Sequence, residues 1–466
     1  MMEGRVESQY IDLYKSQKSL IDAHSAPALN AFREKAAQVL AAVGLQKAKD
    51  FTHVDPEEVL AADYSLNLAR HEVPTAREDL FTCAVPELST SVHFMVNEQY
   101  VANGKPQAAI ESEKGVYVGS LRQFAQTHPE LIQKYYNQLA SRRTHTGDER
   151  SKAYESCSLG ESALNTMLCQ DGFVLYVPAG VQIEKTIQLI SLLRSVEDFM
   201  AVQRLLIIVE EGAKASLLSC EHASRLNDEA HLLSLQTTEV FVGRNATLDF
   251  YCLEEHHDLS IRLGQIYVRQ EGGSNVALGQ YALTVGQTRN RIHIELTEPD
   301  AQTQLYGMAT LDAEQHLDNI TFIDHQAPGC SSNELFKYVL DDKSRGSFLG
   351  RILVRKDSFK TDAHQTDRNL CLTPEARMIA RPELEIYADD VKCSHGSTVG
   401  QLDQQAMFYM RTRGIPEAEA RMLLMFAFMS DVIDGIRIEP LKDRLKHLIE
   451  KRFRGELTQC KGCKIN

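Results

Sequence analysis

The sequence lacks long apolar runs, an excess of positive charge and a recognisable secretory leader. None of its 466 residues lie in an uninterrupted stretch approaching the roughly 20 apolar residues that cross a bilayer. The N-terminal stretch MMEGRVESQYIDLYKSQ is polar and has no apolar core of a secretory signal. Lysine and arginine number 50 against 64 acidic residues, and the net charge of −14 disfavours attraction to nucleic acids and anionic membranes. We therefore expect a cytoplasmic protein with neither nucleic acid nor membrane as a partner.

The common catalytic motifs are also missing. There is no G-x-x-x-x-G-K-[ST] phosphate loop and no G-x-G-x-x-G after a strand, the usual motifs for nucleotide hydrolysis and dinucleotide binding. A G-x-S-x-G elbow and an H-E-x-x-H helix are absent as well. The ten cysteines are scattered between Cys83 and Cys463 and are expected to be reduced thiols. We expect a non-catalytic chain that binds no nucleotide, so that a partner must hydrolyse any ATP used in its work.

Residues 1–150 are predicted to form a mostly helical region with one short hairpin. Residues 28–42 place five apolar side chains on one helical face: Leu29, Phe32, Ala36, Val39 and Leu40. Residues 92–101 contain two short β-branched runs around Asn-Glu-Gln, which indicates a hairpin, and residues 121–140 are predicted to form a helix. The polar stretch THTGDERS at 144–151 is the expected boundary.

Residues 151–392 have a different character, because short β-branched runs recur between turn signals. The runs include 173–177, 205–209, 240–242, 292–296 and 351–354. The turn signals include PAG at 178–180, EGA at 211–213, GRN at 243–245, GGS at 272–274 and PDA at 299–301. Their spacing of roughly 27 to 33 residues is in the range of stacked repeats. A β-sandwich or barrel remains an alternative, but imperfect repeats over this length favour a parallel β-helix whose ends are capped by the flanking helical regions.

Residues 393–466 are predicted to be helical again. Asp403 is a suitable N-terminal cap for a helix that ends near Gly414, and Pro416 sits at the start of the next helix. That second helix, 417–433, is apolar nearly all round, which indicates either deep burial or cover by a partner, with core burial favoured. Residues 441–453 form an amphipathic, basic third helix.

The tightest cluster of metal-binding side chains is Cys393-Ser394-His395. On an extended strand residues i and i+2 point the same way, so the thiol and the imidazole lie about 7 Å apart on one face. Thiolates bind iron–sulfur clusters, and imidazole replaces thiolate in some of them. Two ligands do not complete a cluster site, so the others must come from elsewhere. On its own, however, C-x-H is more often a buried cysteine beside a hydrogen-bonded histidine.

Other polar groups carry weaker signals. Cys460 and Cys463 form a lone C-x-x-C near the C-terminus, a modest candidate for metal contact that is more simply interpreted as a disordered tail. His256-His257 follows two glutamates, but adjacent strand residues point to opposite faces, so we interpret it as a solvated loop. Asp362 with His364, and Asp324 with His325, are interpreted as ordinary polar positions.

A longer run carries a family resemblance. Residues 381–414, RPELEIYADDVKCSHGSTVGQLDQQAMFYMRTRG, closely resemble the C-terminal signature of the SufB/SufD family of SUF iron–sulfur cluster assembly proteins. Supporting matches are GFVLYVPAG at 172–180, the residues KTDA at 360–363 followed by Asn369-Leu370, and GIPEA at 414–418. SufB-like chains tend to read C-E-H-E, whereas Ser394 and Gly396 stand at the two acidic positions here. The chain therefore resembles the SufD branch of the family.

This resemblance implies a right-handed parallel β-helix, mainly β, between N- and C-terminal helical regions. It implies a complex in which the chain pairs with SufB and binds the ATPase SufC, whose ATP-driven movement remodels the interface where a nascent cluster is built. By similarity His395 is expected at that interface, facing a cysteine of SufB, with Cys393 as a secondary candidate; both are candidate ligands for iron or for a transient cluster shared with SufB. The helices after Gln404 would engage SufC, with these candidate contacts: Met407, Phe408, Tyr409, Arg411, Met425 and Phe428.

Two alternatives to this function stay open on the residues alone. The chain could be a purely structural organiser that stabilises SufB and recruits SufC without binding the cluster. A β-helix carbohydrate-active enzyme such as a pectate lyase is the other, but it predicts a secretory signal that the sequence lacks. An isolated chain could also form a homodimer through an exposed strand edge of the β-helix.

Overall fold

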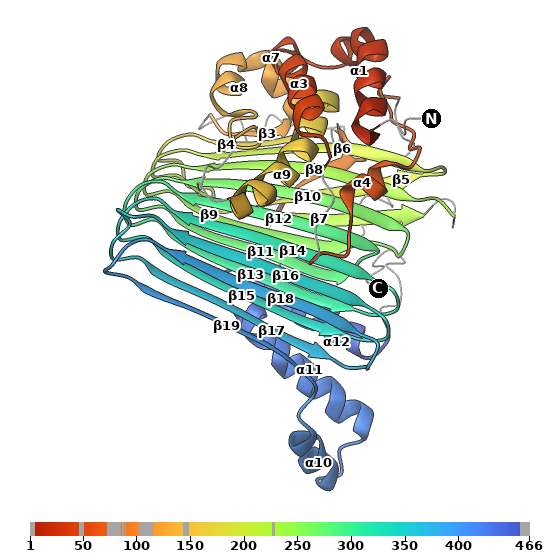
Figure 1. The fold of residues 1–466 in the computed structure, drawn as a ribbon, viewed down its shortest axis with the longest axis vertical. Helices are drawn as coiled ribbons and strands as arrows, with labels where there is room; N and C mark the ends of the chain where they lie inside the picture. The colour runs from red at the N-terminus through yellow and green to blue at the C-terminus, as the bar shows by residue number, and fades with distance from the viewer. Residues whose placement is uncertain are drawn as a thin grey trace.

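The computed structural model describes residues 5–45, 51–71, 85, 88, 90–101, 115–142, 149–225 and 229–456. Its centre is a two-sided parallel solenoid in which consecutive strands alternate between two sheets (Figure 1). Sheet A is defined by these strands: β3 (Tyr117–Ser120), β4 (Phe173–Val177), β6 (Phe199–Val209), β8 (Leu232–Val242), β10 (Ser260–Gln270), β12 (Gln287–Leu296), β14 (His316–His325), β16 (Arg345–Val354) and β18 (Arg377–Ile386). The prediction of a mainly β, parallel solenoid fold is confirmed.

Sheet B runs alongside sheet A and contains the other half of each coil. Its strands are β1 (Thr90–Val96), β2 (Gln99–Val101), β5 (Thr186–Ser195), β7 (Lys214–Arg225), β9 (Thr247–Glu255), β11 (Asn275–Thr284), β13 (Gln302–Leu311), β15 (Ser331–Leu340), β17 (Asp362–Cys371) and β19 (Lys392–Gly400). The predicted hairpin is present as antiparallel β1 and β2, and β1 also pairs in parallel with β5. The hairpin therefore closes one end of sheet B.

The predicted turn signals form one column along an edge of the solenoid. Each coil turns there through a residue with positive φ, a conformation that suits glycine, asparagine and aspartate. The residues are Gly180, Gly212, Asn245, Gly273, Asp300, Gly329 and Lys360. Backbone N–H groups at these turns donate hydrogen bonds to carbonyl oxygens of the next coil. The N–H of Gly180 donates to the carbonyl of Glu211 at 2.8 Å, and that of Gly273 donates to the carbonyl of Pro299 at 3.0 Å. The turns therefore extend the parallel hydrogen-bond ladder beyond the strands.

Apolar side chains of the two sheets meet between them and form the solenoid core. Leu217, Leu248 and Val276 of sheet B lie fully or almost fully buried there, as do Ile207 and Ile294 of sheet A. Parallel strands covered on both faces read as nearly continuous apolar runs, which is why simple alternation is weak in this region of the sequence.

The N-terminal helices cover the outer face of sheet A over β4, β6, β8 and β10 (Figure 1). They are α1 (Val6–Ala23), α2 (Pro27–Asn30), α3 (Arg33–Val43), α4 (Pro56–Leu60), α7 (Leu121–Thr127), α8 (Pro129–Tyr135) and α9 (Glu149–Leu168). Helix α9 packs closely on α3, because Gly160 meets the carbonyl of Gly44 at a spacing that leaves no room for a Cβ atom. The helices of the described residues are too short or too polar to cross a membrane.

The element boundaries differ from the predicted ones at four places. The helical stretch predicted over 28–42 is divided into α2 and α3 by a turn at residues 31–32. The helix predicted over 121–140 is two helices, because Pro129 forces the preceding residue His128 out of helical geometry. Helix α9 runs across the expected boundary near residue 150 and contacts β6 and β8. Strand β19 extends the solenoid to Gly400, past the expected limit at 392.

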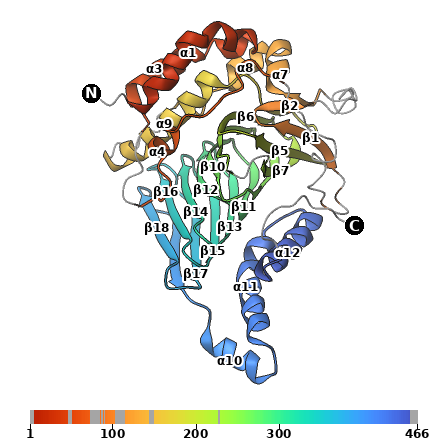
Figure 2. The ribbon, with the colours of Figure 1, turned by 90° about the vertical axis from the view of Figure 1, so that its right-hand side faces the viewer.

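The C-terminal helices are α10 (Gln404–Thr412), α11 (Glu417–Asp434) and α12 (Glu439–Phe453), close to the predicted ranges. Asp403 caps α10 as predicted, accepting hydrogen bonds from the backbone N–H groups of Gln405 and Ala406. Helices α11 and α12 pack on the outer face of sheet B, whereas α10 extends away from the solenoid (Figure 2). Helices from the N-terminal region thus pack on sheet A, and helices from the C-terminal region pack on sheet B.

A buried ion pair fastens the N-terminal region to sheet A. Arg204 of β6 pairs with Glu239 of β8, and both side chains are fully buried. Glu239 also accepts the backbone N–H groups of Asn137, Leu139 and Ala140, which directly follow α8. The carboxylate therefore joins two strands to the segment that leads toward α9.

We expect Glu239→Gln to lower the free energy of unfolding by about 3–5 kcal/mol, because it leaves the Arg204 cation buried without a counter-ion. The control is Glu298→Gln, which breaks the exposed pair with Arg244 and is expected to cost less than about 1 kcal/mol. Denaturant unfolding of both variants measures the difference. Equal losses in the two variants would show that Glu239 does not have this anchoring role.

Candidate functional site

The segment Lys392–Gly400 forms β19, the last strand of sheet B. It pairs in parallel with β17, and within the described part of the chain no strand pairs with its other edge. Nearly all its residues are exposed. An edge strand of this kind presents unpaired backbone N–H and C=O groups, which makes it a template for a strand from another chain.

Cys393 and His395 lie at inward-facing positions of β19, on one face as the spacing predicts. Cys393 is paired in register with the core residue Ala363 and packs against the solenoid core. Its half-burial raises the pKa of the thiol. His395 is paired in register with Gln365 and is exposed at the open end of the solenoid. The two predicted ligands therefore differ: the thiol is partly sheltered, and the imidazole is accessible.

Polar side chains lie directly beneath His395 inside the solenoid. Gln365 of β17 donates from Nε2 to Oε2 of Glu334 on β15 at 2.6 Å. Asp367 accepts hydrogen bonds through Oδ2 from Asn369 at 2.7 Å and from Ser397 of β19 at 3.0 Å. Burial raises the pKa of Glu334 and of Asp367 to about 7. This polar group at the end of the solenoid interior was missed from the sequence, although the inward positions of β15 and β17 carry its signal.

Two other polar sites named from the sequence lie on outward sides of strands, an exposed one on β17 and a buried one on β14. His364 forms an ion pair with Asp362 at 2.8 Å and bonds the hydroxyl of Ser394 at 2.7 Å. Asp324 is fully buried and accepts two hydrogen bonds from Arg355. These contacts are structural, in line with the interpretation of both sites as ordinary polar positions.

The His256 interpretation is wrong. His256 is buried inside the solenoid rather than in a solvated loop, and burial lowers its pKa to about 3. Near it Arg262 pairs with Glu221 at 2.7 Å and with Glu254 at 3.2 Å, all within the interior. Charges at inward positions of three separate strands compensate one another there. Sequence spacing does not reveal such a network, because its members lie far apart in the chain.

In the described ranges no three His, Cys, Asp or Glu side chains come together as a metal site. Cys393 and His395 are thus two candidate ligands and not a complete set. Cys460 and Cys463 lie outside the described residues.

The six candidate contacts for a partner ATPase divide into exposed and buried groups. Phe408 and Tyr409 of α10 are 71% and 60% exposed, and Arg411 is exposed beside Glu417. Met407 is buried, and Met425 lies buried between α11 and sheet B. Phe428 is partly buried against the same face. The exposed aromatic surface is therefore on α10, the helix that stands away from the body of the protein (Figure 2).

A buried lysine fastens α11 to the solenoid. Lys337 of β15 donates to the carbonyl of Phe428 at 2.6 Å and to Asp431 at 2.7 Å. Its ammonium group also lies 4.9 Å from the centre of the Phe428 ring, within cation–π range. Because Lys337 is almost fully buried, Asp431 is the counter-ion that compensates its charge.

We expect Asp431→Ala to speed hydrogen exchange of the α11 amides by about tenfold or more, since Lys337 then remains buried without a carboxylate. Asp434→Ala is the matched control on the same helix, because Asp434 pairs with the partly exposed Lys446 at 3.3 Å and not with a buried cation. Hydrogen exchange with mass spectrometry resolves the helix. Equal exchange in the two variants would contradict the anchoring role of Lys337.

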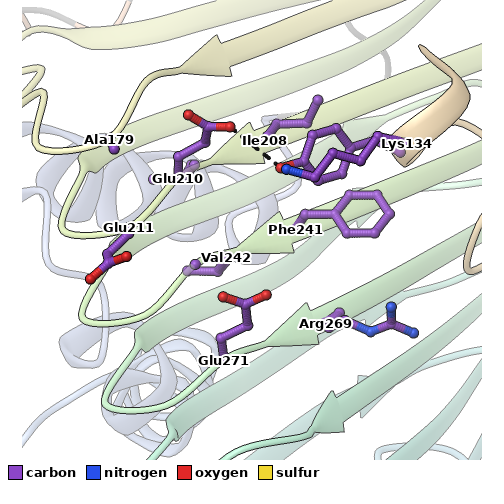
Figure 3. A pocket seen from close by; sticks show the side chains of 12 residues that line it. Lys134, Ala179, Ile208, Glu210, Glu211, Phe241, Val242, Arg269 and Glu271 are labelled. Carbon is purple, nitrogen blue, oxygen red and sulfur yellow. Dashed lines mark hydrogen bonds between the residues drawn. The ribbon is translucent and has the colours of Figure 1, made fainter. Parts of the chain in front are cut away.

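A separate cavity of about 420 Å³ lies on the outer face of sheet A beside α8 (Figure 3). Tyr135 and Phe241 form its aromatic wall, with ring centres 4.9 Å apart. Glu210 accepts a hydrogen bond from Tyr135, and Lys134 lies over the Tyr135 ring. The cavity lies over β6, β8 and β10 and contains none of the predicted site residues.

These features define a class: a β-solenoid covered by helices on both faces, whose candidate iron ligands stand at an open end. The sequence matches the family described as "SUF system FeS cluster assembly, SufBD core domain" over residues 192–428, and the family described as "SufBD protein N-terminal region" over residues 4–189. The chain therefore belongs to the SufB/SufD family of iron–sulfur cluster assembly proteins.

Among the most similar relatives, the iron-sulfur cluster assembly protein SufD of Escherichia coli is 31% identical over 245 residues, 53% of this chain and 57% of that protein. SufD of Bacillus subtilis is 24% identical over 427 residues, 88% of this chain and 92% of that protein. An iron-sulfur cluster assembly SufBD family protein of Synechocystis is 29% identical over 300 residues, 62% and 66% of the two chains. The chain thus spans less than two thirds of the Escherichia coli and Synechocystis relatives. The similarity supports a role in SUF iron–sulfur cluster assembly and argues against the carbohydrate-active alternative.

Proposed function

We propose that this chain is a non-catalytic, SufD-type subunit that pairs with SufB, binds the ATPase SufC and supplies part of the site where a nascent iron–sulfur cluster is built. The observation that carries the proposal is the open edge strand β19 with His395 exposed at an inward-facing position. A strand of a second solenoid can continue the hydrogen-bond ladder at that edge. Continuation of the ladder would bring ligands of the partner opposite His395.

The two candidate ligands have unequal chemistry. A neutral imidazole binds iron through a ring nitrogen without first losing a proton at neutral pH. A thiol must lose its proton to become a ligand, and half-burial of Cys393 raises its pKa. His395 is therefore the principal ligand in this proposal and Cys393 an auxiliary one. In this proposal the cluster is cargo that must leave the site. A chain that supplies only part of the ligand set is suited to releasing it.

Energy from ATP would reach the site through the C-terminal helices. The exposed aromatic side chains of α10 offer a contact surface for SufC, and Arg413 lies 5.2 Å from the ring centre of Tyr409. Helix α11 connects that surface to sheet B through Lys337 of β15, which is two strands away from β19 in the sheet. Movement of α10 with a bound ATPase would thus act on the coils nearest the open end.

We expect His395→Ala to reduce cluster assembly at least tenfold in the complex reconstituted with SufB and SufC, because the substitution removes the exposed nitrogen ligand. Iron and acid-labile sulfide per purified complex are the measurement. Cys393→Ala is expected to cause a smaller loss. His231→Ala changes an exposed histidine beside Asp198, between β7 and β8, and serves as the control. If His395→Ala assembles clusters as the wild type does, His395 has no ligand role.

We expect the double substitution Phe408→Ala with Tyr409→Ala to weaken binding of SufC by at least tenfold, since large exposed aromatic residues dominate such interfaces. Titration calorimetry with purified SufC measures the affinity. Val196→Ala removes a comparably exposed apolar side chain between β5 and β6 and is the control. Unchanged affinity in the α10 variant would place the SufC contact elsewhere.

One observation favours the alternative of a purely structural organiser. The raised pKa of the Cys393 thiol leaves it protonated at neutral pH, so it is a weak ligand unless a metal displaces the proton. The two roles separate in the His395→Ala complex: an organiser predicts normal cluster content in an intact complex, and a ligand role predicts an intact complex without clusters.

A further inference from the structure

The inward face of the last coils carries a group of buried polar side chains. Glu334 of β15 and Gln365, Asp367 and Asn369 of β17 are each at most 2% exposed. They lie beside core side chains on the same strands, such as Phe336. Gly350, across the interior on β16, leaves the space that the amide of Gln365 occupies. Four buried hydrogen-bonding side chains therefore occupy neighbouring inward positions of β15 and β17 at the end of the solenoid.

Hydrogen bonds within this group satisfy only part of its acceptors. Gln365 donates to Glu334, and Asn369 donates to Asp367. Neither amide can be turned over, because its oxygen would then face a carboxylate oxygen. Buried oxygens without a hydrogen-bond partner include Oε1 of Gln365, Oδ1 of Asp367 and Oδ1 of Asn369. Buried acceptors in this state indicate a bound cation, a proton or a water molecule.

The other interior carboxylates of the solenoid show how this chain compensates buried negative charge. Glu221 and Glu254 are paired with Arg262 at 2.7 and 3.2 Å. Among the described residues no Lys, Arg or His forms an ion pair with Glu334 or Asp367 within 4.0 Å, although both are fully buried. The contrast within one protein indicates that the positive charge at this end comes from outside the chain.

Access to the group is through the open end of the solenoid. His395 is the register neighbour of Gln365, and Ser397 is the register neighbour of Asp367 and bonds it. Both belong to the exposed edge strand β19. One strand therefore separates the buried oxygens from solvent, a short path for a small ion but not for a larger ligand.

We propose that Glu334, Gln365 and Asp367 form a binding site for a hard divalent cation, one strand inside His395. Carboxylate and amide oxygens are the ligands that Mg²⁺, Mn²⁺ and Fe²⁺ accept, whereas softer metals prefer thiolate and imidazole. The site binds the cation whether or not a cluster forms. We further infer that Fe²⁺ is the physiological occupant and is held there before it reaches His395. This part of the inference rests on the proposed function.

The first test uses Mn²⁺ as a redox-stable probe of the full-length chain at pH 7.5. Binding removes the six-line electron paramagnetic resonance signal of free Mn²⁺. We expect one site in the wild type and affinity at least tenfold lower after Glu334→Gln combined with Asp367→Asn. Asp357→Asn, an exposed carboxylate in the loop between β16 and β17, is the matched control and is expected to bind as the wild type.

A second measurement needs no variant and holds even if the double substitution does not fold. Fe²⁺ with ascorbate and peroxide cleaves a backbone close to the bound ion. We expect cleavage of the wild type within β15, β17 and β19. No Mn²⁺ binding by the wild type, undiminished binding by the double variant, or cleavage confined to other segments would each overturn the site and would favour protons or water as the compensation.

His395→Ala separates this inference from the proposed function. We expect that variant to bind Mn²⁺ within about threefold of the wild type, because the oxygen ligands remain. Cluster assembly by the same variant reports only on the proposed function. Loss of Mn²⁺ binding in the His395→Ala variant would show that the oxygens alone do not form the site.

Discussion

The backbone hydrogen-bond ladder of the parallel strands is the constraint on which the rest of the structure depends. Every strand from β4 to β17 is paired on both of its edges. At the N-terminal end the antiparallel strands β2 and β3 terminate the two sheets. At the other end the ladder stops at β18 and β19, and β19 carries Cys393 and His395. The place where the solenoid can grow is thus the place where its candidate ligands lie.

Helices cover both faces of the solenoid and leave that end open. The N-terminal helices lie on sheet A, and α11 and α12 lie on sheet B, so lateral association through either sheet face is blocked over the covered strands. Helix α10 stands beyond the solenoid with its aromatic side chains exposed (Figure 2). The open edge strand β19 and the exposed aromatic side chains of α10 are therefore separate surfaces, connected through α11.

Local signals in the sequence were sufficient for most of the fold. Turn residues such as Gly273 and Asn245 adopt the positive φ that their types favour, and Asp403 caps its helix. The interior charges were not predictable, because Arg262 and Glu221 are neighbours only after the coils stack. His256 was misassigned for the same reason: its polarity indicates solvent, whereas the stacked coils bury it. Of the candidate site, the shared face of Cys393 and His395 follows from strand geometry, but the buried oxygens of Glu334 and Asp367 depend on the neighbouring coils.

The central claim is that a nitrogen of this chain binds the nascent cluster at the open end. The most direct measurement is electron spin-echo spectroscopy of the reduced cluster in a complex whose only ¹⁵N-histidine-labelled subunit is this chain. The account predicts a ¹⁵N coupling of the strength of a directly bound imidazole, which disappears when His395 is replaced. A cluster present in normal amount with no coupling to ¹⁵N from this chain would contradict it.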